Sequence, residues 1–348
     1  MGHVHTCRAA GREITVTAIK EDAIPQLQRR LDDAEKNSRR GAGISRFAIP
    51  WQARLILLAA IWGMSFLFIK VGDGALAPLQ VALGRTILGT ATLLLILAIR
   101  REGLPRGRQV WLHLAVAAVL FNALPYSLFA YGELHTTSVL AGIWNATTPL
   151  FAAPLAILML PRERLSRERL VGLALGFIGV LIVLGVWQGL GGSALLGNLL
   201  CLGAAASYGL GFPYTRKYLA DRGESTLALA TGQLLCGTIE LAIITPFLTH
   251  APPVLPLKVI ASILVLGILG TGIGYLLNYS LIRDAGPTVA STVTYLIPLF
   301  STAAGVLVLG EPLTWYEPVG ALVVILGVVV SQGRLPTVSR TATRAEST

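Results

Sequence analysis

The chain has 348 residues, of which 54% are hydrophobic and only 13% are charged. A soluble domain usually has about 25% charged residues, so a surface built from this chain would be too apolar for water. The charges are also concentrated in residues 1–54, which hold 16 of the 46 Lys, Arg, Asp and Glu side chains. This composition excludes a soluble enzyme and a disordered chain, and it predicts an all-α, polytopic membrane protein.

The amino-terminal segment, residues 1–53, is polar and charged and contains no apolar run of membrane length. We expect a disordered cytoplasmic extension here, with a short amphipathic helix over Ile24–Ala34 as the alternative. At the other end of the chain, we expect residues 333–348 to form a cytoplasmic tail.

Ten apolar runs lie between these two segments and are separated by short loops. A helix needs about 20 apolar residues to cross a bilayer, and runs that are continuous do not have the alternating pattern of a β-barrel. The predicted spans are residues 55–71, 79–99, 110–130, 136–160, 170–187, 195–215, 227–248, 259–281, 288–309 and 317–331.

Basic residues lie almost entirely in alternate loops. With a cytoplasmic amino terminus, the loops and tail on that side hold 15 Lys and Arg residues, whereas the other side has Lys258, with Lys70 at a span end. Cytoplasmic loops of membrane proteins carry such an excess. We therefore predict a multi-pass protein of the cell membrane, inner or plasma, with both termini cytoplasmic. The net charge of +10 then reflects topology and not nucleic-acid binding.

The second half of the membrane region repeats the first half, over residues 54–188 and 194–332. Each copy has five spans, an odd number, so the copies enter the membrane with opposite orientation. Equivalent loops have opposite basic character, which supports this inversion. The aligned pairs include Gly84 and Gly232, Tyr126 and Tyr275, Ala141 and Ala290, Pro149 and Pro298, Gly172 and Gly320, and Gly179 and Gly327.

The end of each repeat carries the most specific motifs. The first copy has Ser138-Val139-Leu140-Ala141, then Pro149 and Glu163; the second has Thr288-Val289-Ala290-Ser291, then Pro298 and Glu311 in Leu309-Gly310-Glu311-Pro312-Leu313. Residues 55–332 thus resemble the EamA-type family of the drug/metabolite transporter superfamily. The resemblance implies a secondary carrier of small metabolites, often an exporter of amino acids or related compounds. The family more often has Gly before the Glu that is Glu163 here, and the amino-terminal extension is not part of the usual pattern.

Two ionisable side chains lie well inside predicted spans, where such groups are costly and often functional. We expect Arg85 to anchor a substrate carboxylate, with a snorkelling or helix-bonded structural cation as the alternative. We expect Glu240 to bind a coupling proton, with a packed, protonated acid as the alternative.

Polar and aromatic side chains within the spans are candidates for the wall of a substrate cavity, with hydrogen bonding between packed helices as the alternative. Pro149 and Pro298 each remove a helical hydrogen bond and are the expected hinges. The remaining cavity candidates are Trp62, Asn122, Tyr126, Trp144, Asn145, Thr148, Tyr208, Tyr275, Asn278, Thr294 and Tyr295.

Motifs for other chemistry are missing from the sequence, which has no P-loop, metal-ligand cluster or nucleophile elbow. We therefore expect no enzyme activity, catalytic residue, cofactor or metal. The prediction is a monomeric or homodimeric secondary active transporter that moves amino acids or related small metabolites by alternating access. Export and proton linkage are the expected mode. The alternatives are an efflux carrier for drugs or other hydrophobic compounds, a channel and a non-transporting scaffold.

Overall fold

The computed structural model describes residues 5–9, 12–16, 49–160, 167–188, 192–219, 222–250, 254–285, 290 and 292–331. The chain forms two units, Met1–Pro50 and Trp51–Thr348. In the first unit, strands β1 (His5–Ala9) and β2 (Arg12–Val16) pair in antiparallel orientation. The polar sequence does not predict these strands. The alternative helix over Ile24–Ala34 and the tail from residue 332 lie outside the described residues.

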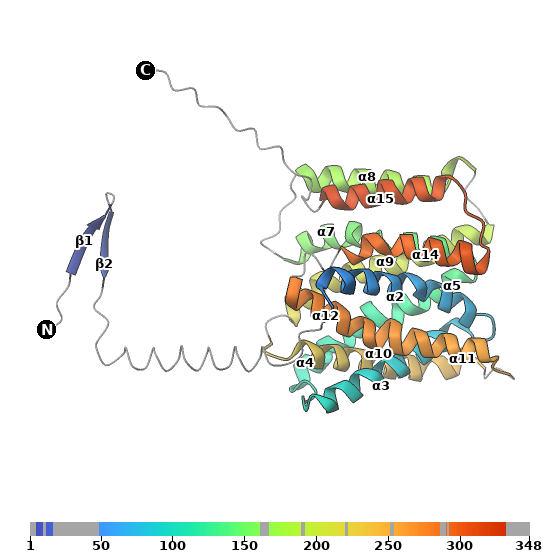
Figure 1. Cartoon of the computed structure of the whole chain (residues 1–348), viewed down its shortest axis with the longest axis horizontal. Coiled ribbons are helices and arrows are strands. Elements are labelled where there is room, and N and C mark those ends of the chain that lie inside the picture. Colours follow the sequence, from blue (N-terminus) through green and yellow to red (C-terminus); the bar gives the residue numbers. More distant parts are fainter. Residues whose placement is uncertain are drawn as a thin grey trace, which may run out of the picture. The chain divides into compact units, whose positions relative to one another are not determined.

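Each of the ten predicted spans has a helical counterpart in the second unit (Figure 1). Among the residues described, seven helical stretches are long and apolar enough to cross a membrane, and three shorter apolar helices lie within α8, α14 and α15. The elements are α2 (Trp51–Gly72), α3 (Pro78–Ile99), α4 (Arg108–Ala118), the π-helical turn η2 (Val119–Ala123), α5 (Leu124–Glu133), α6 (Ser138–Asn145), α7 (Thr148–Met159), α8 (Arg167–Val183), η3 (Val186–Gln188), α9 (Gly192–Tyr218), α10 (Thr226–Leu248), α11 (Leu257–Leu264), the π-helical stretch η4 (Val265–Ile273), α12 (Gly274–Ala285), α14 (Val293–Leu309) and α15 (Tyr316–Ser331).

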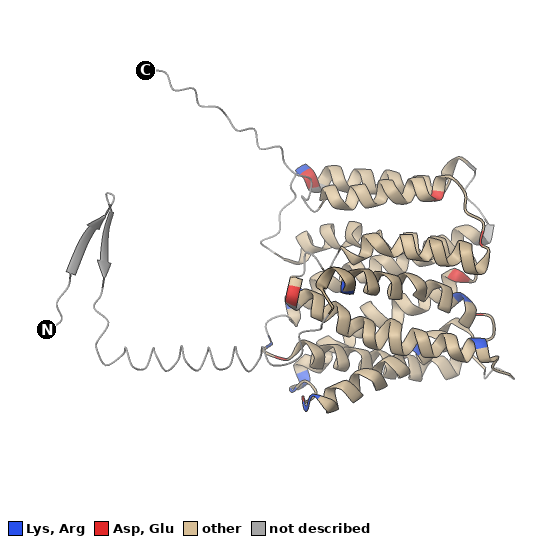
Figure 2. Cartoon of the chain, viewed as in Figure 1, with Lys and Arg blue, Asp and Glu red and all other residues tan. Residues whose placement is uncertain are grey.

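Charged residues lie mainly near the two ends of these helices, and the middle parts of the helices are largely uncharged (Figure 2). The end of the bundle at which α2 begins also contains Arg100, Arg216 and Lys217, and we call it the basic end. The other end, at which α2 finishes and α3 begins, is called the opposite end. This distribution is typical of a protein whose middle is surrounded by hydrocarbon.

The two repeats meet along α3 and α10, the second helices of each copy. Leu93, late in α3, shares a core cluster with Leu227, early in α10. Leu79, near the start of α3, shares another cluster with Leu241, late in α10. The two helices are therefore antiparallel neighbours.

A twofold relation between the repeats is visible in their side-chain contacts. Thr90 and Thr238, which are equivalent at a sequence offset of 148, share a hydrogen bond between their hydroxyls at 2.8 Å. An axis that relates two antiparallel neighbours runs perpendicular to both, in the plane of the membrane, so the repeats are inverted as the sequence predicts. The same axis relates further close contacts in pairs. The contact of Gly89 with Thr271 is equivalent to that of Gly237 with Asn122. The contact of Gly63 with Phe300 is equivalent to that of Gly209 with Phe151.

Helices α8 and α15, the last of each repeat, form a pair that lies side by side in Figure 1. A Cβ atom on Gly179 would lie 2.6 Å from the Val324 nitrogen, and a Cβ atom on Gly320 would lie 2.6 Å from Val183 Cγ2. Small residues let helix backbones approach closely where no hydrophobic effect drives association. The aligned glycines of the two repeats therefore form one helix–helix contact.

Replacing Gly179 with Val tests this contact. The added side chain has no room against the α15 backbone, so we expect a loss of about 1–3 kcal/mol of stability and a lower thermal unfolding midpoint in detergent. Gly103, which has no neighbouring atom within 4 Å of an added Cβ, is the matched site for a Gly103→Val control. Equal midpoints for the two variants would contradict the close packing.

Candidate functional site

A cavity of about 590 Å³ lies between the two repeats and takes wall residues from both. Its volume is in the range of sites that hold one small molecule. Nine of the predicted cavity residues line it: Trp62, Arg85, Tyr126, Asn145, Thr148, Tyr208, Tyr275, Asn278 and Thr294.

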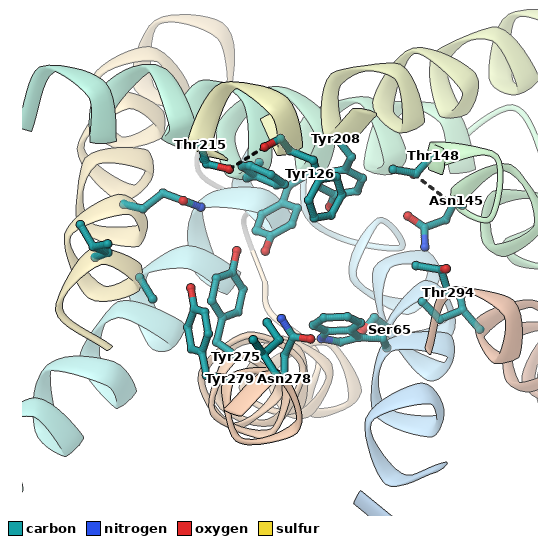
Figure 3. A pocket seen from close by; sticks show the side chains of 18 of the residues that line it. Ser65, Tyr126, Asn145, Thr148, Tyr208, Thr215, Tyr275, Asn278, Tyr279 and Thr294 are labelled. Carbon is teal, nitrogen blue, oxygen red and sulfur yellow. Dashed lines mark hydrogen bonds between the residues drawn. The ribbon is translucent and has the colours of Figure 1, made fainter. Parts of the chain in front are cut away.

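Four tyrosines form the middle of the cavity wall. In Figure 3, Tyr126 and Tyr208 point toward Tyr275 and Tyr279, which rise from α12 on the other side. The rings of Tyr275 and Tyr279 meet edge to face, with centroids 6.2 Å apart. Aromatic rings with polar tips can contact an apolar group and accept or donate a hydrogen bond. Tyr279 follows Tyr275 by one helical turn, so the two side chains share one face of α12.

Arg85 supplies a buried positive charge to the wall. Its residue is 8% exposed, Nε donates to Thr271 Oγ1 at 2.9 Å, and Cζ lies 3.8 Å from the centre of the Tyr126 ring. Among the described residues, no Asp or Glu forms an ion pair with this guanidinium. The two terminal NH2 groups of an arginine held in this way are available to bind a carboxylate ligand.

Asn122 lies directly behind the wall and is completely buried. Its Nδ2 donates to the Tyr275 hydroxyl at 3.0 Å and to the Tyr126 hydroxyl at 3.3 Å. Gln233, which lines the cavity, donates from Nε2 to Asn122 Oδ1 at 3.0 Å. The amide of Asn122 therefore orients two tyrosines and does not face the cavity itself, which differs from the predicted role.

The two polar contacts just described are equivalent under the repeat. Arg85 aligns with Gln233 at an offset of 148, and Thr271 aligns with Asn122 at an offset of 149. In each copy, α3 or α10 bonds to the π-helical segment of the other copy, η4 or η2. Such π-helical segments occur frequently at functional sites. The repeat offset applied to Arg85 and Asn122 would have identified Gln233 and Thr271 from sequence alone.

Three other predicted residues lie away from the cavity wall. Trp144 is fully buried in the core, where Nε1 donates to Asn198 Oδ1 at 3.0 Å. Tyr295 packs against the same core cluster. Glu240 is half-buried on α10, next to the exposed Ile239, and does not line the cavity. The role of Glu240 in binding a coupling proton stays a prediction.

The two predicted hinge prolines occupy different settings. Pro149 is in the first turn of α7, directly after a two-residue break that separates α6 from α7. Pro298 lies inside α14, and that helix continues through it. The fourth predicted span is thus two helices, whereas α14 is continuous through its proline.

The cavity reaches the basic end of the bundle. Its wall includes Leu219 and Thr226, which flank the loop between α9 and α10 at that end. Toward the opposite end the wall stops near Ile69 and Phe129. There, the Phe129 ring packs edge to face on Phe66, with centroids 5.3 Å apart. The cavity therefore has its mouth at the basic end.

Comparisons with known proteins agree with this architecture. The EamA-like transporter family matches residues 50–185 and 195–332, one match for each repeat. The Bacillus subtilis protein named "Uncharacterized transporter YvbV" is 30% identical over 79% of this chain and 88% of its own. A Salmonella typhimurium protein named "Probable amino-acid metabolite efflux pump" is 25% identical over 79% of this chain and 92% of its own.

A solved crystal structure has the same fold. It superimposes with a TM-score of 0.58 over 80% of this chain and 96% of that chain, at 20% sequence identity. The duplicated match covers nearly all of the helical unit, and each match corresponds to five helical spans. The chain belongs to the EamA-like transporter family.

Proposed function

We propose that the chain is a secondary active transporter that exports amino acids or related small metabolites by alternating access. The observation that carries the proposal is a cavity between two inverted repeats that reaches one end of the bundle and stops short of the other. Inverted repeats that rock about a central site expose that site to each side in turn. The conformation described here is the one in which the basic end is open.

The basic end faces the cytoplasm in this proposal, with both termini on that side and the protein in the cell membrane. Arg100, Arg216 and Lys217 at this end support the assignment, because cytoplasmic loops are rich in Lys and Arg. A mouth on the cytoplasmic side is the loading state of an exporter. The Salmonella typhimurium relative, which is named as an efflux pump, supports the same direction.

The substrate class follows from the chemistry of the wall. Arg85 is suited to a carboxylate, and Asn278 and the tyrosine hydroxyls are suited to an amino group or another polar group. The remaining wall is aromatic and aliphatic, including Trp62 and Phe121, and suits an apolar side chain. A hydrophobic compound without a carboxylate is the second candidate, because the same aromatic wall would accept it.

Replacing Arg85 with Gln separates these two candidates. The variant loses a charge-assisted hydrogen bond, so we expect the apparent affinity for carboxylated substrates to fall about 10- to 100-fold. Uptake of the corresponding amino-acid amide should change little. Counterflow of labelled amino acids in proteoliposomes measures both. Arg106→Gln, which removes an exposed loop cation, is the matched control. An equal effect on acid and amide would favour the hydrophobic-compound carrier.

Thiol labelling tests the position of the mouth. On a background with Cys7 and Cys236 changed to Ser, Leu229→Cys on the cavity wall should react with a charged, membrane-impermeant reagent in inside-out vesicles. Bound substrate should slow the reaction. Leu134→Cys, on the exposed loop at the opposite end, should react in right-side-out cells instead. Labelling of both positions from one side would contradict the proposed orientation of the carrier.

A further inference from the structure

Four charged side chains gather at the opposite end of the bundle, beyond the closed limit of the cavity. They are Lys70 near the end of α2, Asp73 in the turn that follows, Glu133 at the end of α5, and Glu311 in the loop after α14. We call them the closed-end cluster. None of them lines the cavity.

Lys70 and Glu311 are well supplied with hydrogen bonds. Lys70 Nζ donates to the main-chain carbonyls of Glu133 and Thr136, the latter at 2.8 Å, and so caps the carboxyl end of α5. The Glu311 carboxylate accepts from Ser138 N at 2.9 Å, from Ser138 Oγ at 2.8 Å and from Val139 N at 3.1 Å. These donors belong to the first turn of α6, where a negative charge is favoured. Both groups are therefore suited to their ionised forms.

Glu133 and Asp73 are in a different position. Glu133 is 0% exposed, and neither of its carboxyl oxygens has a hydrogen-bond partner among the described residues. Both carboxyl oxygens of Asp73 are likewise buried without a partner in the described part of the chain. An ionised carboxylate without donors is far more costly in such surroundings than a neutral carboxylic acid.

The charged and titratable groups that act on Glu133 come from every side. They are Lys70 of α2, Asp73, Arg85 of α3, Cys201 of α9 and Glu311. The charges of Lys70 and Glu311 already balance within the cluster. Two additional carboxylates would leave it with excess negative charge in a buried site. The closed arrangement can thus hold Glu133 and Asp73 as neutral acids, but it does not stabilise both of them as carboxylates.

We propose that Glu133 and Asp73 form a proton-binding site whose occupation is linked to closure of the opposite end of the bundle. The inference rests on the proposed alternating access, because opening that end separates α2 from α5 and admits water to both carboxyls. Protons from the outer side would then bind as the end closes. Arg85, which lines the cavity and also interacts with Glu133, connects this site to the substrate site.

The direction of the pH effect follows from Asp73, which lies outside the helices. Burial raises the pKa of Asp73 from 3.8 to about 8, and the neighbouring Lys70 opposes this rise. Exposure to water on opening returns the pKa toward its ordinary value. At a pH between 3.8 and about 8, Asp73 is protonated in the closed state and ionised in the open state, so the closed state holds one proton more. Falling pH therefore favours closure, by up to about tenfold per pH unit for one proton.

Distances between spin labels measure this equilibrium in the full-length protein without any substrate. Labels at Gly74→Cys and Leu134→Cys, both exposed at the opposite end, report the separation of α2 from α5. In liposomes we expect the separated population to rise with pH between about 4 and about 8. In the double variant Glu133→Gln and Asp73→Asn, the amides imitate the protonated acids. The population with separated labels should therefore stay low at every pH.

Glu240→Gln is the control, since it neutralises a half-buried acid that lies away from the cluster. It should keep the pH dependence of the parent protein. Loss of the dependence in Glu240→Gln alone, its persistence in the double variant, or a shift with sodium at fixed pH would overturn the proposal.

A second measurement on the unmodified side chains does not depend on how the variants fold. Infrared difference spectra should show a carboxylic-acid band that weakens as the pH rises between about 4 and about 8, and its absence would overturn the proposal. A protein that shows the pH-dependent opening but no substrate flux would retain the proton site and lose the transporter proposal. A protein that shows substrate flux without the pH-dependent opening would retain the transporter proposal and lose the proton site.

Discussion

Polar groups inside a membrane need partners within the protein, and among the described residues several long-range partners lie in the other repeat. Arg85 bonds to Thr271, Gln233 bonds to Asn122, and Thr90 bonds to Thr238. Each of these contacts crosses the interface between α3 or α10 and the opposite copy. Because unpaired polar groups are costly in hydrocarbon, these bonds fix the register of the two repeats. The cavity and its mouth depend on that register.

Duplication gives the two halves the same backbone arrangement, and different residues at equivalent positions make the two halves chemically different. Arg85 in the first copy corresponds to the neutral Gln233 in the second, so only one half of the cavity carries a buried cation. The opposite end likewise holds Glu133, whose equivalent at an offset of 149 is the apolar Ile282. A ligand with a carboxylate therefore has one preferred orientation in a site whose backbone has nearly equivalent halves.

The sequence predicts the helices and their inverted pairing well, because apolar runs and glycine spacing report directly on bilayer crossing and close packing. It predicts the direction of individual side chains poorly, because membrane helices are apolar on all faces. Trp144 and Asn145 illustrate the difficulty, since neighbours in sequence lie in the core and on the cavity wall. The π-helical segments add a register shift that has no sequence signature. The closed-end cluster joins three separate parts of the chain, which no single-span pattern contains.

The pairing of α8 with α15 has a consequence for biosynthesis. The ribosome completes α8 long before α15, the last of the described helices, and α8 packs on α15 far more extensively than on any other element. The glycine-lined face of α8 must therefore remain among lipids while the second repeat is being translated. A chain that stops before Tyr316 would leave that face uncovered. The first repeat is therefore fully packed only after the final span of the second has been made.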